Sequence, residues 1–343
     1  MTASEIERLR GPILRSVSRS FYLSLRILPR PLRDPLSLAY LLARATDTIA
    51  DTAELPMELR AESLRDLAGA IQGTAGHDGA EQLRDTFAPR QSDGAERALI
   101  EAVPAAIAWL EGLNERDRGE VRGVLKKINA GQTFDLERFG SSTSTSTSTS
   151  TSTSIEALKT AAELEEYTYL VAGCVGEFWT RICFAHVPNF SDRSEAEMLA
   201  LGVQYGKGLQ LINILRDAGE DLRNGRCYFP ADELQSLGLK PKVMLEDPAR
   251  AEPILRRWRE KAEEGMKAGI DYACAIKSRR IRFGTALPAL IGARTLALLR
   301  EAGPAAFERK VKVSRAEVKK MMVSAAVTRA SPGKLRETFR RLS

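Results

Sequence analysis

The amino-acid sequence predicts an all-α protein. Apolar residues recur at intervals of three and four along almost the whole chain, as on one face of a helix, and the alternating pattern of a strand is nearly absent. Asp34 followed by Pro35 is typical of an N-cap and a first-turn proline, so we expect a helix to begin there. Further helices are expected over about 57–73, 94–111, 114–131, 157–185, 193–221, 248–275, 279–301 and 314–327.

The helix that begins near Asp34 carries two aspartates in an otherwise apolar run, "LSLAYLLARATDTIADT". A spacing of four places Asp47 and Asp51 on one face of this helix, and Tyr40 and Arg44 fall on the same stripe. The other positions are mostly apolar, which indicates a buried helix. Because buried carboxylates without counter-charge are costly, the stripe must meet cations, a ligand or a water-filled cleft.

A second helix repeats this pattern after a low-complexity tract. The tract "SSTSTSTSTSTSTS", residues 141–154, cannot bury apolar surface, so we expect a mobile loop there and assign it no chemistry. In the helix expected over 193–221, a polar stripe lies among leucines and isoleucines: Gln210, Asn213, Asp217 and Asp221. The simplest way to satisfy both stripes is for the two helices to face each other across one cavity, so we expect a single domain over residues 1–343.

The residue types on the two stripes favour magnesium and a diphosphate. Carboxylate and amide oxygens form a hard ligand set, and Mg²⁺ prefers one or two carboxylates together with waters and substrate phosphates. Arg216, Arg223 and Arg226 add positive charge beside the second stripe. His77 and His186 are the only histidines and no C-x-x-C spacing occurs, which argues against zinc and indicates reduced cysteines in the core.

Charge and hydropathy limit the other classes. The net charge is +6. The excess of basic residues is concentrated in residues 301–343, which contain 11 Lys and Arg and 4 Asp and Glu. Such a region attracts nucleic acid, anionic lipid or a phosphorylated small molecule; the buried acid stripes argue against nucleic acid. No signal peptide is found, and Arg282 and Arg294 interrupt the most apolar run. We expect a cytoplasmic protein, with peripheral contact to the inner face of the membrane left open and the oligomeric state not predicted.

Four segments resemble, in order, the signatures of the squalene/phytoene synthase family: "SRSFYLSLRILP", "YLLARATDTIAD", "YTYLVAGCVGEFW" and "QLINILRDAGEDLRNGRCYFP". The resemblance implies an isoprenoid-synthase helical bundle around a central apolar cavity. It also implies Mg²⁺ at two aspartate-rich motifs and head-to-head condensation of two prenyl diphosphates. The small-residue run "VAGCVG" is expected to let helices approach closely.

The same resemblance implies a role for particular residues. The metal would be bound by Asp47, Asp51, Asp217 and Asp221. The catalytic candidates are Tyr40, Arg44, Tyr167 and Arg216, among which Tyr167 is the candidate for proton transfer or pyrophosphate handling. Substrate-binding positions are Ser20, Phe21, Gln210, Asn213, Arg226 and Tyr228. Phe21, Tyr167, Tyr169 and Tyr228 can offer aromatic faces to a carbocation.

The product is the open point within the family. The segment "FERKVKVSRAEVKKMM", residues 307–322, resembles the part of squalene synthases where basic residues help bind NADPH, which makes Lys312 and Arg315 the candidates. We expect two farnesyl diphosphates to give presqualene diphosphate and then, with NADPH, squalene. Ala50 instead gives "DTIAD", nearer to the dehydrosqualene and phytoene synthase pattern, so synthesis of those products without reduction stays the alternative. A catalytically inactive scaffold is disfavoured because every matched position keeps a competent side chain.

Overall fold

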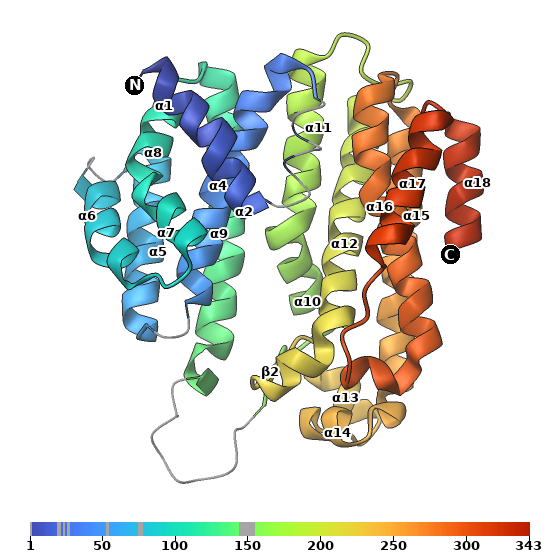
Figure 1. The fold of residues 1–343 in the computed structure, drawn as a ribbon. Coiled ribbons are helices and arrows are strands. Elements are labelled where there is room, and N and C mark those ends of the chain that lie inside the picture. Colours follow the sequence, from blue (N-terminus) through green and yellow to red (C-terminus); the bar gives the residue numbers. More distant parts are fainter. Residues whose placement is uncertain are drawn as a thin grey trace. The chain divides into compact units, whose positions relative to one another are not determined.

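A computed structural model describes residues 2–18, 22, 25, 28–52, 55–74, 78–143 and 155–343 (Figure 1). The described residues are almost entirely helical, apart from one parallel pair of two-residue strands, which confirms the all-α prediction. The chain forms two compact units. Unit 1 comprises Met1–Glu137 and Arg181–His186, and unit 2 comprises Arg138–Thr180 and Val187–Ser343. Each is described separately below, and the expected single domain stays a prediction.

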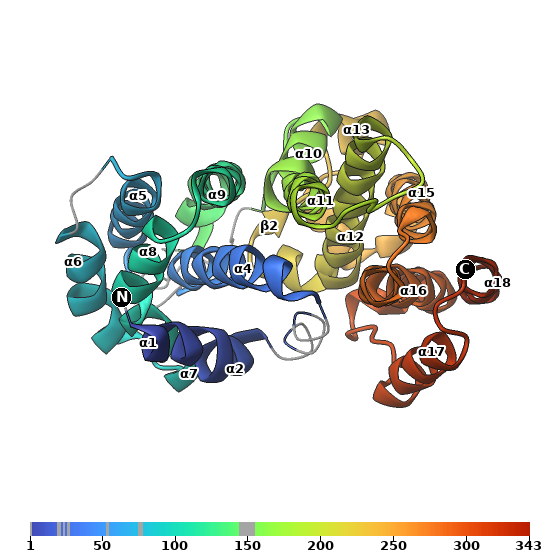
Figure 2. The same ribbon diagram turned by 90° about the horizontal axis from the view of Figure 1, so that it is seen from above.

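Unit 1 is built around one central helix, α4 (Arg30–Asp51). Most leucines and alanines on its apolar faces are buried, and the helix packs against α2, α5, α7 and α8 (Figure 2). This packing holds α4 firmly and leaves its polar stripe at fixed positions. The other elements of the unit are α1 (Ala3–Arg8), η1 (Leu9–Ile13), α2 (Leu14–Ser18), α5 (Met57–Gln72), α6 (Asp78–Phe87), η2 (Ala88–Arg90), α7 (Gly94–Glu101), α8 (Val103–Glu111) and most of α9 (Glu115–Thr143).

Unit 2 is built around α12 (Glu195–Arg223), which lies beside α15 (Glu252–Ala275) and α16 (Arg279–Ala302) (Figures 1 and 2). A Cβ on Gly208 would lie only 2.7 Å from Gly265 Cα, so α12 and α15 can approach this closely only through glycine. The remaining elements are β1 (Glu156–Ala157), α10 (Ala161–Thr168), η3 (Tyr169–Gly173), α11 (Cys174–His186, shared with unit 1), β2 (Arg226–Cys227), α13 (Ala231–Ser236), α14 (Pro241–Glu246), η4 (Pro248–Ala251), η5 (Gly303–Phe307), α17 (Arg315–Val327) and α18 (Pro332–Leu342).

The predicted N-cap of α4, Asp34, is wrong by five residues. The helix begins at Arg30, with Pro29 before it and another proline in the first turn, and Pro35 lies inside the helix. Proline is tolerated there because the carbonyl one turn earlier still lies at the helix start, where few hydrogen bonds are lost. Asp34 does not cap the helix; its carboxylate accepts a hydrogen bond from Arg10 Nη1 at 2.6 Å.

Three other predicted segments also differ from the structure. The helix expected over 94–111 is two helices that meet at Ala102, because a proline opens the second one. The segment 157–185 contains a strand end and three successive helical pieces. Finally, α9 continues through Thr143, so the first residues of the expected loop at 141–154 are helical, and residues 144–154 lie outside the described part.

Two predictions about the chain's chemistry can be checked directly. All four cysteines are buried free thiols, as expected for reduced core residues. Burial raises the pKa of the Cys227 thiol to about 12, so this thiol stays protonated at neutral pH. Among the described helices, none combines the length and the apolar character needed to cross a membrane.

Candidate functional site

The polar stripe predicted on α4 exists. Tyr40, Arg44 and Asp47 are partly buried and Asp51 is exposed, whereas Leu41, Leu42 and Ala45 between them are buried. Tyr40 Oη donates to the carbonyl of Val17 at 3.3 Å, which ties this end of the stripe to α2. The stripe therefore presents two carboxylates, a guanidinium and a phenol along one line of a rigid helix.

Arg44 links Asp47 to Glu96, a carboxylate on another helix that no spacing pattern in the sequence indicates. Its Nη1 donates to Asp47 Oδ2 at 2.5 Å, and its Nη2 donates to Glu96 on α7. Burial raises the pKa of Asp47 above its ordinary value, and the charges of Glu96 and Asp135 raise it further, although Arg44 opposes them. Two carboxylates thus share one guanidinium, with the charge of Asp135 also acting on Asp47, so an additional cation would be bound favourably.

The stripe predicted on α12 exists as well. Gln210, Asp217 and Asp221 are partly buried and Asn213 is exposed, while Ile212 and other residues on the opposite side are buried. Asn213 Nδ2 donates to Gln210 Oε1 at 3.3 Å, so the two amides are hydrogen-bonded to each other. Amide and carboxylate oxygens consequently follow one line over nearly three turns.

The pKa of Asp217 is lowered, whereas that of Asp47 is raised. Arg216 Nε donates to Asp217 Oδ1 at 3.0 Å, and Lys310 Nζ lies 3.5 Å from the same oxygen. Although burial raises the pKa of Asp217, Arg216 and Lys310 outweigh it, and the net pKa is lowered. Asp217 is therefore an ionised carboxylate that already has its counter-charge.

Aromatic residues gather at the end of α10. Tyr167 and Tyr228 are both buried and stack with their ring centroids 5.1 Å apart, and Phe139 meets the edge of Tyr228 at 5.2 Å. Tyr167 lies two residues before η3, a π-helical turn, and such turns are frequent at functional sites. Tyr169 differs from its neighbour, because its hydroxyl donates to Glu177 Oε2 at 3.0 Å.

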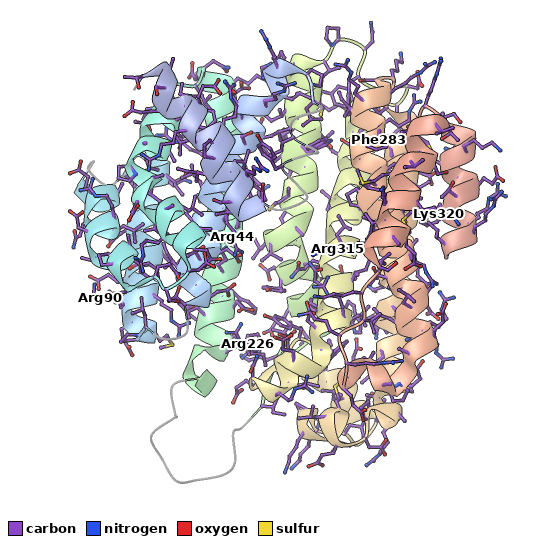
Figure 3. All side chains as sticks on the ribbon, in the orientation of Figure 1. Arg44, Arg90, Arg226, Phe283, Arg315 and Lys320 are labelled. Atoms are coloured by element: carbon purple, nitrogen blue, oxygen red, sulfur yellow. The ribbon has the colours of Figure 1, made fainter. Side chains whose placement is uncertain are left out.

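The strand pair holds the end of the aromatic cluster in place. β1 and β2 run parallel, with Glu156 opposite Arg226 and Ala157 opposite Cys227. This pairing fixes the backbone just before Tyr228. Arg226, which is labelled in Figure 3, precedes Tyr228 by two residues in the sequence. Ser20 and Phe21, the remaining substrate-site candidates, lie outside the described residues.

Lys312 and Arg315 lie on either side of Ser314, the N-cap of α17, and Figure 3 shows Arg315 at the start of that helix. Both side chains are exposed, and neither forms an ion pair with any residue that the structure describes. Glu317 instead completes the capping box with Ser314 and pairs with Arg294. The two cations are therefore available to an anionic ligand.

The aspartates fit magnesium only in partnership with a substrate. Within the described residues, no group of three or more His, Cys, Asp or Glu side chains is arranged to hold a metal ion. Each helix instead contributes two aspartates one turn apart, and such a pair suits a Mg²⁺ ion whose remaining ligands are water and phosphate oxygens. Asp47 and Asp51 would hold one such group, and Asp217 and Asp221 the other.

Several polar partners were missed because only tertiary packing reveals them. Glu96 is 52 residues from Arg44 in the chain. Glu165 accepts from both Lys207 and Lys261, and although burial raises its pKa, these two hydrogen bonds lower the pKa overall. The network joins α10, α12 and α15 two residues before Tyr167. No spacing rule within one segment could have indicated it.

Comparison with known proteins gives the same assignment as the motifs. The sequence model of the family described as squalene/phytoene synthase matches residues 14–317. The chain belongs to the squalene/phytoene synthase family. The phytoene synthase of Mycobacterium bovis is 28% identical over 336 residues, covering 96% of this chain and 93% of that protein. The squalene synthase of Gibberella zeae is 25% identical over 312 residues, covering 90% of this chain and 62% of that protein.

Solved structures confirm the fold of this family member. The structure of TcSQS in complex with the ligand BPH1237 matches it with a TM-score of 0.75 at 21% identity, covering 99% of this chain and 90% of that one. The helical bundle predicted from the family resemblance is thus confirmed as a fold. Family membership makes the chain an isoprenoid synthase of the prenyltransferase type. It does not specify the product, because the relatives include both a phytoene synthase and a squalene synthase.

Proposed function

We propose that this enzyme joins two farnesyl diphosphates head to head, through presqualene diphosphate, and that NADPH reduces the final cation to squalene. The observation that carries the proposal is the presence of two carboxylate pairs on two rigid helices, each with an arginine bound to its first aspartate. Such pairs suit Mg²⁺ bound to a diphosphate. The basic segment with Lys312 and Arg315 supports the reductive last step.

The first chemical task is departure of diphosphate from an allylic carbon. Mg²⁺, when bound, supplies positive charge that stabilises the leaving group. Asp47, Asp51, Asp217 and Asp221 would position the metal–diphosphate groups. Arg44 and Arg216 can turn from their aspartates to the developing negative charge, where preorganised donors are most effective. Gln210, Asn213 and Arg226 would orient the rest of the diphosphate by hydrogen bonds.

The second task is protection of the carbocation that remains. Stacked Tyr167 and Tyr228, with Phe139 at their edge, exclude water and offer π faces, each worth up to about 2 kcal/mol when desolvated. In this proposal the hydroxyl of Tyr167 handles a proton or the released diphosphate, and Tyr40 supports the α4 stripe. Ser20 and Phe21 complete the substrate-binding set.

The same proposal includes a cellular setting. We place the enzyme in the cytoplasm, with the basic C-terminal region, residues 301–343, in peripheral contact with the inner face of the membrane. On α17, Val323 and Val327 are exposed, which is unusual for large apolar side chains, and the exposed Lys319 and Lys320 lie on the same helix. Apolar and cationic groups together suit an anionic lipid surface.

A second candidate function is synthesis of phytoene or dehydrosqualene without reduction. The match to a phytoene synthase over 96% of this chain favours it, as does Ala50 between the α4 aspartates. Both functions share the first condensation and differ at the final cation. Loss of a proton gives the unreduced product, whereas hydride from NADPH gives squalene.

Incubation with farnesyl diphosphate and Mg²⁺, with and without NADPH, separates the two. We expect squalene as the main product with NADPH, and presqualene diphosphate or unreduced hydrocarbon without it. Replacing both Lys312 and Arg315 by alanine should raise the KM for NADPH and leave the first release of diphosphate unchanged. The matched control is the double alanine variant of Lys319 and Lys320, which lie further along α17 and should not alter that KM. Figure 3 shows Lys320 on this helix.

Unreduced hydrocarbon at every NADPH concentration would exclude squalene synthesis and support the second candidate. A KM for NADPH that changes equally in both double variants would remove the specific role of Lys312 and Arg315.

A further inference from the structure

Residues 303–313, here called the strap, lead from α16 to α17 and pass over the acidic end of α12 (Figure 1). The strap is anchored at Phe307. Arg223 Nη1 donates to the carbonyl of Phe307 at 2.9 Å, and a Cβ on Gly219 would overlap the backbone of Phe307. Phe307 is itself buried. One end of the strap is thus fixed to α12 by backbone contact and a hydrogen bond.

Three residues beyond this anchor, Lys310 reaches back to the carboxylates of α12. Its Nζ lies 3.0 Å from Glu220 Oε2 and 3.5 Å from Asp217 Oδ1. The side chain of Lys310 is 45% exposed and that of Asp217 is 23% exposed, so both groups of this ion pair are partly accessible to solvent. Both carboxylates raise the pKa of Lys310, which keeps it charged.

We propose that Lys310 is a built-in counter-cation for the acidic end of α12, and that a divalent cation bound with diphosphate displaces it from Asp217. The inference rests on the proposed metal-binding role of Asp217. A metal ion bound to Asp217 would repel the Lys310 ammonium, which lies 3.5 Å from Asp217 Oδ1, the longer of its two carboxylate contacts. The diphosphate that arrives with the metal offers the displaced ammonium new oxygens of opposite charge.

The anchor determines which part of the strap moves. Because Phe307 stays fixed on α12, displacement of Lys310 from Asp217 loosens the segment 308–313 and leaves η5 in place. That segment leads directly to Ser314, the N-cap of α17, and includes Lys312. Lys310 therefore couples occupancy of the aspartates on α12 to the position of the basic segment proposed to bind NADPH.

Binding of Mn²⁺ in the presence of inorganic diphosphate, measured by calorimetry on the whole protein, tests this directly. Two partly exposed ion pairs are worth about 0.2–1 kcal/mol each. Their removal in Lys310→Met should therefore tighten Mn²⁺ binding by about two- to thirtyfold. Lys310→Arg keeps the charge and should bind Mn²⁺ as the wild type does. Arg309→Gln removes a neighbouring charge that has no ion pair among the described residues, and should change the affinity less than twofold.

Hydrogen exchange of the strap gives a second readout that does not depend on turnover. Amides of residues 308–313 should exchange faster in the wild type after Mn²⁺ and diphosphate are added. In Lys310→Met they should already exchange fast without either. The amides of α12 near Gly219 serve as the internal reference, because the anchor is unchanged.

The outcomes separate the inference from the function on which it rests. Equal Mn²⁺ affinity and equal exchange in wild type and Lys310→Met would overturn the inference and leave metal binding intact. If Lys310→Met and Arg309→Gln tightened Mn²⁺ binding equally, the inference would also be overturned, because the loss of one positive charge would then explain the effect. No Mn²⁺ binding by the wild type with diphosphate would overturn the proposed metal role itself.

Discussion

Asp47→Asn and Asp217→Asn are each expected to lower kcat/KM for farnesyl diphosphate by at least about a hundredfold, since even outer-shell partners of a bound metal change activity by about 10- to 100-fold. Each substitution removes a metal-ligand charge and almost no volume. Far-UV circular dichroism and Tm should stay close to the wild type, because both residues lie on partly exposed stripes. Steady-state release of diphosphate, with the circular dichroism of the same samples, measures both quantities.

Asp34→Asn is the matched control on α4. Asp34 is also a partly exposed aspartate in an ion pair with an arginine, but it lies at the other end of the helix from Asp47. Its activity should stay within about twofold of the wild type, as expected for a surface position away from a site. Near-normal turnover in both Asp47→Asn and Asp217→Asn would refute the assignment of the two stripes to the reaction.

Gly206→Val should destabilise unit 2 by about 3 kcal/mol, near the upper end of the usual overpacking range. A Cβ at Gly206 would overlap the carbonyl of Ala172 in η3, and backbone cannot move aside as a side chain can. The same crossing is narrow at Gly176 and Gly202, which meet in the same way. Urea denaturation followed by circular dichroism gives the free energy of unfolding.

Gly123→Val tests whether the loss comes from packing. Gly123 lies on α9, and a Cβ there would meet no atom within 4 Å. Valine has a slightly better helix propensity than glycine, so this variant should stay within about 0.5 kcal/mol of the wild type. Equal stability of Gly206→Val and Gly123→Val would show that the crossing of α12 with η3 is not as tight as described.

The sequence was sufficient for the features that depend on local spacing. Helical periodicity predicted the all-α class, and four-residue spacing predicted the stripes of α4 and α12. The run "VAGCVG" predicted a close helix crossing, which Ala172, Gly176 and their partners on α12 confirm. The helix start at Asp34 failed because several prolines near residue 30 fit a first turn equally well, and local rules cannot choose among them.

The features that the sequence could not predict all join distant segments. Glu96 reaches Arg44 from another helix, and Lys310 reaches Glu220 over 90 residues. Phe139 joins the aromatic cluster from the far side of the Ser/Thr-rich tract. Each contact depends on how the helices pack. The sequence around a charged or aromatic residue does not show which distant residue it will contact.

The stoichiometry of diphosphate release tests the central claim, that the enzyme joins two prenyl diphosphates head to head through the acid pairs of α4 and α12. The measurement counts inorganic diphosphate and extracted hydrocarbon in one reaction with farnesyl diphosphate, Mg²⁺ and saturating NADPH. The mechanism ionises one farnesyl diphosphate and then presqualene diphosphate, so it predicts two diphosphates for every hydrocarbon of two farnesyl groups. One diphosphate per condensation, with a longer prenyl diphosphate as the final product, would contradict the account.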